Sequence, residues 1–183
     1  MDELINMLNT RGSKNSSKVL TENIERLNAS IQSILNQQIK NELVSSQIYR
    51  AMSMCLDAKG YVNASKVYFK YANEELEHMN KIYNYMLERN CKPLVPECPL
   101  QKLSYNDIRE IIDESLKHEM KVSFQWEEIA KVCLENKDNT TYEFSSWFLK
   151  EQVEEENKFR DLLYRINLGI PDWELEELFK SKI

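Results

Sequence analysis

The placement of glycine and proline constrains the fold of this chain more than any other feature. Only three glycines and four prolines occur in 183 residues. Beyond Gly12, these residues interrupt the chain only at Gly60, at Pro93, Pro96 and Pro99, and at Gly169 and Pro171. The stretches between these breakers are long enough for helices of about seven turns, roughly 40 Å each. The sequence therefore predicts an all-α fold.

Apolar residues recur at helical spacing within the uninterrupted stretches. The expected helices cover residues 28–59, 61–90, 104–136 and 142–167, and a short fifth helix covers 172–180. Phe69 is assigned to the apolar side of the second helix. Ser104 followed by Asp107 predicts an N-terminal cap for the third helix. Residues 138–141 are expected to form the turn before the fourth.

The proline-rich segment between the second and third helices is too long for a hairpin turn. About 14 residues with the ~3.1 Å rise of polyproline II cover ~43 Å, close to the length of the helices. The segment is therefore predicted to cross the whole bundle, so that the third helix runs parallel to the second. Its leucine and valine side chains are expected to anchor it.

Composition narrows the class of protein. With 42% hydrophobic and 30% charged residues, the chain can bury one sizeable core. A net charge of -6 without Lys/Arg clusters argues against nucleic-acid or anionic-membrane partners. No run of 18 apolar residues predicts a membrane span, and the cysteines form no C-x-x-C pair. We expect a cytoplasmic protein with reduced thiols.

The first residues differ from the rest in composition. Residues 1–22 are polar around Gly12 and are expected to form a flexible extension before a domain that spans 23–183. The apolar residues within 1–8 are compatible with a docked turn or with part of a targeting segment. The region lacks the apolar core of a secretory signal peptide.

A Glu-x-x-His pair lies in the middle of the second predicted helix. Glu75 and His78 are three residues apart, so both side chains project from one helix face and can bind one metal ion. Helical bundles use such pairs to build di-iron and di-manganese centres with glutamates from neighbouring helices. Alone, such a pair is more often a structural hydrogen bond.

The other long helices supply the additional polar residues. Glu119, for example, lies seven residues from both Ile112 and Trp126, within the apolar stripe of its helix. The expected inward polar set is Glu42, Glu75, His78, Glu119, Gln152 and Glu155. Four carboxylates with one imidazole and one amide suit iron or manganese better than structural zinc. Without a cation these carboxylates would raise one another's pKa, so metal binding should tighten the site.

Four motifs on four predicted helices resemble the ferritin family, particularly its non-haem bacterial-type branch. They are NELVSSQIY at 41–49, NEELEH at 73–78, HE at 118–119 and WFLKEQVEEE at 147–156. The match covers residues 31–166 in order and spacing. The resemblance implies a four-helix bundle with a long crossover and a short fifth helix, assembled into a 24-subunit cage. It also implies Fe(II) oxidation by dioxygen or hydrogen peroxide and storage of the ferric mineral.

The same resemblance implies roles for individual residues. Glu42, Glu75 and His78 would bind the first iron, and Glu75, Glu119 and Glu155 the second. Gln152 would hydrogen bond beside the centre, and Tyr49 and Trp147 would donate electrons. A third iron site would combine Glu155 with Glu74, Glu151 and Glu154, although a solvated helix face explains residues 151–156 equally well.

Some residues depart from the haem-binding branch of the family. Residues 152–155 read Gln-x-x-Glu, where bacterioferritins have a second Glu-x-x-His, and Leu76 stands where they place the methionine that ligates haem. We therefore expect no haem. His118 is expected at the surface or at an interface, because the other motifs favour Glu119 as the ligand.

Other functions remain compatible with the sequence. One is a small di-iron oxidase or peroxidase of the rubrerythrin type, although the missing C-x-x-C pair counts against it. Another is a helical interaction protein whose glutamates are only surface charge. A ferritin cage could also serve detoxification rather than storage.

Overall fold

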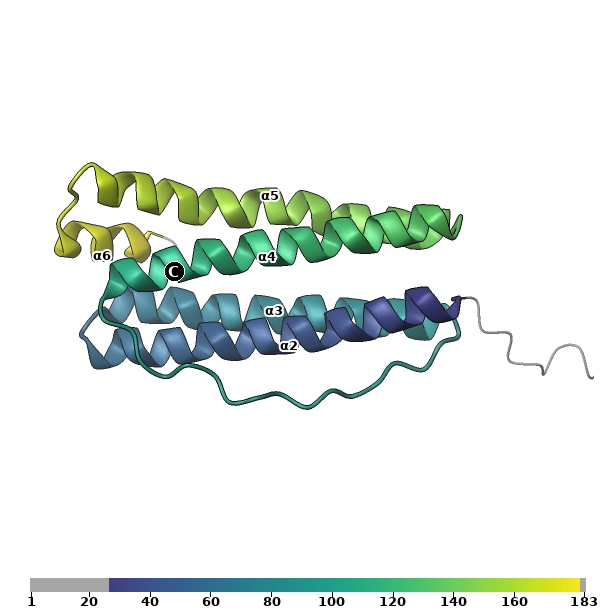
Figure 1. Cartoon of the computed structure of the whole chain (residues 1–183). Coiled ribbons are helices and arrows are strands. Elements are labelled where there is room, and N and C mark those ends of the chain that lie inside the picture. Colours follow the sequence, from purple (N-terminus) through teal and green to yellow (C-terminus); the bar gives the residue numbers. More distant parts are fainter. Residues whose placement is uncertain (1–26, 182–183) are drawn as a thin grey trace, which may run out of the picture.

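The structure is a computed structural model that describes residues 27–181. This part of the chain contains five helices (Figure 1). They are α2 (Ala29–Ala58), α3 (Val62–Glu88), α4 (Ile108–Glu135), α5 (Asn139–Asn167) and the short α6 (Asp172–Lys180). The four long helices lie side by side as a bundle, as the sequence predicted. The predicted extension at 1–22 and its boundary with the domain lie outside the described residues.

Side-chain caps set the starts of three long helices. Asn28 Oδ1 accepts a hydrogen bond from the Ile31 amide at 3.0 Å, and Asp107 Oδ1 accepts one from the Glu110 amide at 2.8 Å. Ser104, the other residue of the expected cap, is exposed. Asp138 accepts from the Thr141 amide at 3.0 Å, so α5 begins at Asn139. The prediction that this helix starts at 142 was wrong by three residues, because the cap lies within the expected turn.

The connection between α3 and α4 runs the length of the bundle, and α4 runs parallel to α3, as predicted (Figure 1). The expected anchoring by its aliphatic side chains is wrong. Leu94, Val95, Leu100 and Leu103 are all exposed, Val95 by 90%. Hydrogen bonds to the Leu94 backbone hold the segment instead, because its amide donates to Asn36 Oδ1 at 2.7 Å and its carbonyl accepts from the Tyr83 hydroxyl at 3.1 Å.

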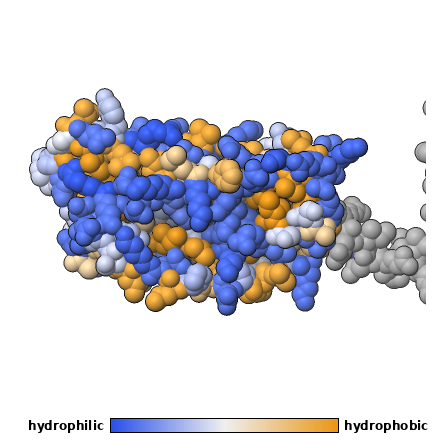
Figure 2. Space-filling model, in the orientation of Figure 1, coloured by the Kyte–Doolittle hydropathy of each residue, from blue (hydrophilic) through white to orange (hydrophobic). Residues whose placement is uncertain are grey.

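Figure 2 shows hydrophobic patches separated by hydrophilic side chains on one face of the molecule. Phe69 is one of the exposed aromatic residues, at 45%, so its assignment to the apolar side of the second helix was wrong. The Arg50 guanidinium lies 4.8 Å from the centre of its ring and covers it from α2. No helix within 27–181 contains a stretch that is apolar and long enough to cross a bilayer.

The apolar core is divided into two clusters along the bundle axis. One cluster contains Leu56, Tyr68 and Phe159, and the other contains Ile82 and Trp126. On each long helix the sequence passes from one cluster to the other through a buried polar segment. The polar residues of four helices therefore meet at mid-bundle, between two dry apolar layers.

The short helix α6 closes one end of the bundle (Figure 1). Leu175 and Phe179 are buried on its inner side. The Glu176 carboxylate accepts hydrogen bonds from the backbone amides of Asn63 and, at 3.0 Å, Ala64. This carboxylate satisfies the first amides of α3, whose own N-cap residue makes no side-chain cap.

Candidate metal centre

The six polar residues expected to face inward are all buried, and they come from all four long helices. Their exposed fractions are at most 9%: Glu42, Glu75, His78, Glu119, Gln152 and Glu155. Buried carboxylates are costly unless hydrogen bonds or cations compensate them. Four of them in one layer of the bundle therefore define the candidate site.

Glu42, Glu75 and His78 form the most compact part of the site. One ligand atom from each lies within 4.8 Å of the others, the only such group of three or more found among residues 27–181. His78 Nδ1 lies 3.3 Å from Glu75 Oε2. Glu42 Oε1 accepts from Gln38 Nε2 at 2.8 Å, whereas its buried Oε2 has no hydrogen-bond partner in the structure. An orphaned carboxylate oxygen beside a second carboxylate and an imidazole fits a cation.

The other two carboxylates are held by protein donors. Glu119 accepts hydrogen bonds from the Tyr49 hydroxyl and, at 3.0 Å, from Gln152 Nε2. Glu155 forms an ion pair with Lys158 one turn further along α5. Gln152 thus donates a hydrogen bond to one carboxylate of the cluster.

The buried position of the cluster disfavours the charged form of its carboxylates. Burial raises the pKa of Glu42 well above 4.5, and the neighbouring charge of Glu75 raises it further. Burial, followed by the charge of Glu119, raises the pKa of Glu75. Burial likewise raises the pKa of Glu119 and Glu155. Burial therefore opposes ionisation of each carboxylate, whereas the Lys158 ammonium at Glu155 and the hydrogen bonds at Glu119 act in the opposite direction on the pKa of those two groups.

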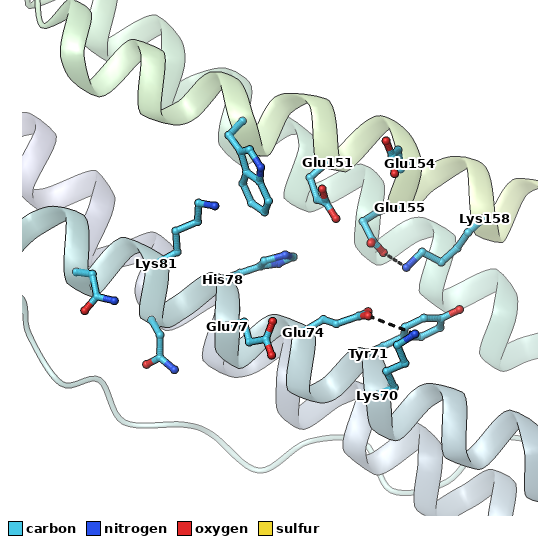
Figure 3. A pocket seen from close by; sticks show the side chains of 13 residues that line it. Lys70, Tyr71, Glu74, Glu77, His78, Lys81, Glu151, Glu154, Glu155 and Lys158 are labelled. Carbon is cyan, nitrogen blue, oxygen red and sulfur yellow. Dashed lines mark ion pairs between the residues drawn. The ribbon is translucent and has the colours of Figure 1, made fainter. Parts of the chain in front are cut away.

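The glutamates expected at a third iron site line an open pocket between α3 and α5 (Figure 3). The pocket has a volume of about 890 Å³, and His78 and Glu155 form part of its wall. Glu74 and Glu151 are half-buried, and Glu154 is exposed. Lys70 Nζ lies 4.0 Å from Glu74 Oε1. The structure places the three glutamates around one pocket without gathering them into a compact ligand group.

Two aromatic residues with expected electron-donor roles lie near the cluster. Tyr49 is buried, and burial together with the charge of Glu119 raises the pKa of its hydroxyl. The Trp147 ring lies 5.7 Å from the His78 ring and is 39% exposed at the pocket. The Lys81 ammonium lies 3.4 Å from the centre of the Trp147 ring.

His118, expected at the surface or at an interface, is half-buried and contacts α2 of its own chain. Its Nε2 lies 2.8 Å from Ser45 Oγ, and its ring packs edge-on against Tyr49 with centroids 5.8 Å apart. Burial lowers its pKa to about 4, so the imidazole is neutral at physiological pH. It therefore supports Tyr49 as an uncharged packing partner.

Sequence reasoning missed two polar residues at the site, Gln38 and Lys158. Gln38 lies four residues before Glu42, and Lys158 lies three after Glu155. The helical spacing of each pair allows these contacts, but it does not distinguish a buried pair from an exposed one. Both donate to carboxylates of the cluster.

The long crossover and the layer of buried carboxylates around a Glu-x-x-His pair define a ferritin-like four-helix bundle protein. A family model described as a ferritin-like domain matches residues 32–168. The chain belongs to the ferritin family, as its motifs indicated.

Relatives and solved structures agree with this assignment. The chain is 33% identical over 143 residues to a bacterial non-heme ferritin of Staphylococcus saprophyticus, covering 76% of this chain and 86% of the relative. It is 29% identical to a probable bacterial non-heme ferritin-like protein of Haemophilus influenzae, covering 81% and 86%. A solved structure of a humanized archaeal ferritin superposes with a TM-score of 0.81 at 25% identity, covering 85% of this chain and 94% of that one.

Proposed function

We propose that this protein binds Fe(II) at the buried carboxylate cluster, oxidises it to Fe(III), and stores the ferric product inside a shell of subunits. The observation that carries the proposal is the buried trio Glu42, Glu75 and His78, with an orphaned oxygen on Glu42. Membership of the ferritin family and the resemblance to bacterial non-heme ferritins support it.

In this proposal the first iron binds to Glu42, Glu75 and His78. The second binds to Glu75, Glu119 and Glu155, so that Glu75 bridges the pair. The charge of Glu119 is the largest electrostatic influence on Glu75 after burial, which supports a shared position. Binding requires all four carboxylates to be ionised, so each iron displaces the protons that their raised pKa values favour.

The donor set also explains why oxidation is favourable here. Anionic oxygen ligands stabilise Fe(III) more than Fe(II), because the attraction grows with the charge of the ion. Two ferrous ions release two electrons, the number that one molecule of dioxygen takes up in forming hydrogen peroxide, or that one hydrogen peroxide takes up in forming water. The apolar clusters on both sides shield the site from bulk water along the bundle axis, and the pocket opens from its side.

The open pocket supplies an approach route. Glu74, Glu77, Glu151 and Glu154 line it, and their charges attract a divalent cation toward His78 and Glu155 (Figure 3). We assign a third iron to Glu74, Glu151 and Glu154 with Glu155, the set that the family resemblance implies and that lines this pocket.

The oxidation step is tested by mixing metal-free protein with Fe(II) and following Fe(III) absorbance and oxidant consumption. Glu75→Gln keeps the side-chain volume and removes the bridging charge, so we expect the initial rate to fall at least about tenfold. Glu127→Gln removes an exposed charge on α4 that does not line the pocket, and it should keep the wild-type rate. Oxidation rates equal to background in all three proteins would instead support the alternative that the chain is a helical interaction protein without oxidase activity.

The assembly is tested separately by size-exclusion chromatography with light scattering. A shell of 24 subunits at 21.8 kDa each elutes far ahead of a small oxidase of the rubrerythrin type. A monomer or dimer that still oxidises Fe(II) would retain the chemistry and refute the storage role.

A further inference from the structure

Lys158 brings a positive charge to the edge of the carboxylate layer. Its ammonium forms an ion pair with Glu155 Oε2 and lies 4.0 Å from the centre of the Tyr71 ring on α3. Figure 3 shows this side chain reaching from α5 toward α3, with its end between Glu155 and Tyr71. The ring of Phe159 lies 5.7 Å from the same ammonium.

The burial of Lys158 distinguishes it from the other lysines that form ion pairs among residues 27–181. Its side chain is only 17% exposed, whereas the others range from 50% to 64%. Lysine normally keeps its ammonium in water because desolvation is costly. A carboxylate and two aromatic faces replace that water here.

The ion pair makes the two halves of the candidate centre unequal. Glu42, Glu75 and His78 already offer ligand atoms close together, whereas Glu155 is engaged with an ammonium of this same chain. Among residues 27–181, no lysine or arginine forms an ion pair with Glu42 or Glu75, so a cation entering the first half has no such pair to break. A cation entering the second half must take Glu155 from Lys158.

We propose that Lys158 determines the order in which the two irons bind. Its ammonium acts as an internal cation that pairs with Glu155 in the metal-free protein. This inference rests on the proposed function of the site. The first iron enters the preformed trio, and the second displaces the ammonium into the pocket.

The structure contains other carboxylates that the displaced Lys158 ammonium can pair with. Lys158, Glu154 and Glu151 line the same open pocket. Glu154 lies four residues before Lys158 on α5, the spacing at which Glu and Lys pair on a helix surface. The lysine stem is long and flexible enough to exchange one partner for the other.

The test compares anaerobic Fe(II) binding to the assembled protein by titration calorimetry. In Lys158→Met, which removes the charge and keeps a flexible stem, we expect the second equivalent to bind at least about tenfold more tightly. The first equivalent should change less than about threefold, since its ligands do not contact Lys158. Lys158→Arg keeps a cation beside Glu155 and should retain the weak second equivalent.

Lys150→Met is the matched control, because it removes an exposed lysine from the same helix. It should change neither equivalent by more than about threefold. Thermal unfolding provides a second readout, in which metal-free Lys158→Met should melt below wild type and gain more from Fe(II). A purely structural ion pair would lower the melting temperature without tightening the second equivalent.

The outcomes separate the two proposals. If wild type binds two equivalents and Lys158→Met leaves the second unchanged or weaker, the role of Lys158 is overturned while the iron site stands. The same holds if Lys158→Arg tightens the second equivalent as much as Lys158→Met. If Glu75→Gln binds as much Fe(II) as wild type, or wild type binds none, the proposed iron site itself is overturned.

Discussion

Replacing Glu42 with glutamine should stabilise the metal-free protein while weakening its metal binding. Glu42 Oε2 is buried without a hydrogen-bond partner and lies beside the carboxylate of Glu75. In Glu42→Gln an amide group takes the place of this oxygen and can donate to Glu75. The bond from Gln38 Nε2 to the other oxygen remains available.

The size of the effect follows from the unsatisfied oxygen. A buried polar atom without a partner costs about 1–3 kcal/mol, and the substitution removes that cost. For a chain of this length, 1 kcal/mol shifts the melting temperature by about 2–4 °C. We therefore expect metal-free Glu42→Gln to melt about 2–10 °C above wild type by calorimetry in the presence of a chelator. Adding Fe(II) without oxidant should reverse the order, because only wild type has the complete trio.

Glu127→Gln is the control for this comparison. It changes an exposed glutamate on α4, away from the pocket, and should alter stability by less than about 0.5 kcal/mol in either condition. A metal-free Glu42→Gln protein that melts below wild type would refute the argument that Glu42 is strained without a cation. Equal stabilisation of both proteins by Fe(II) would refute its role as a ligand.

Three further predictions concern pH, capping and the core. Because burial raises the pKa of Glu42 and Glu75 well above 4.5, the folded metal-free protein holds more protons than the unfolded chain as pH rises past about 4.5. Its melting temperature should therefore fall as pH rises from there toward the folded-state pKa values, and calorimetric scans in which stability rose over this range would contradict this. Asp138→Ala removes the α5 cap and the ion pair with Arg89 at 3.1 Å, so the free energy of unfolding in denaturant should drop by about 2 kcal/mol. An unchanged midpoint of the denaturant unfolding curve would show that neither contact stabilises the fold. Trp126→Ala removes a fully buried ring that stacks on Phe148, and it should lower the free energy of unfolding in the same assay by about 3–5 kcal/mol. A loss below about 1 kcal/mol would contradict this prediction.

The inward polar residues could be predicted because helical periodicity decides which side chains share a face. Gln152 lies four residues after Phe148 and Glu155 four before Phe159, so the burial of these aromatics carries the polar residues inward with them. The length of the crossover was equally informative, since a segment as long as the helices fits the parallel arrangement of α3 and α4.

Contacts at the ends of long side chains could not be predicted in the same way. The spacing of Lys158 and Glu155 is also that of an ordinary exposed helix pair, and only the fold shows that Tyr71 encloses the ammonium. The start of α5 depended on the backbone at Asp138, which periodicity does not report. The exposed leucines of the crossover were misjudged, because hydropathy indicates a tendency to be buried without identifying a surface against which to pack.

Iron-edge anomalous diffraction from crystals soaked anaerobically with Fe(II) tests the central claim most directly. The account predicts two iron peaks between the four long helices, one bound by Glu42, Glu75 and His78 and the other by Glu75, Glu119 and Glu155. At limiting Fe(II), the first peak should appear before the second. Iron found only on the outer glutamates of the pocket, or none within the bundle, would contradict it.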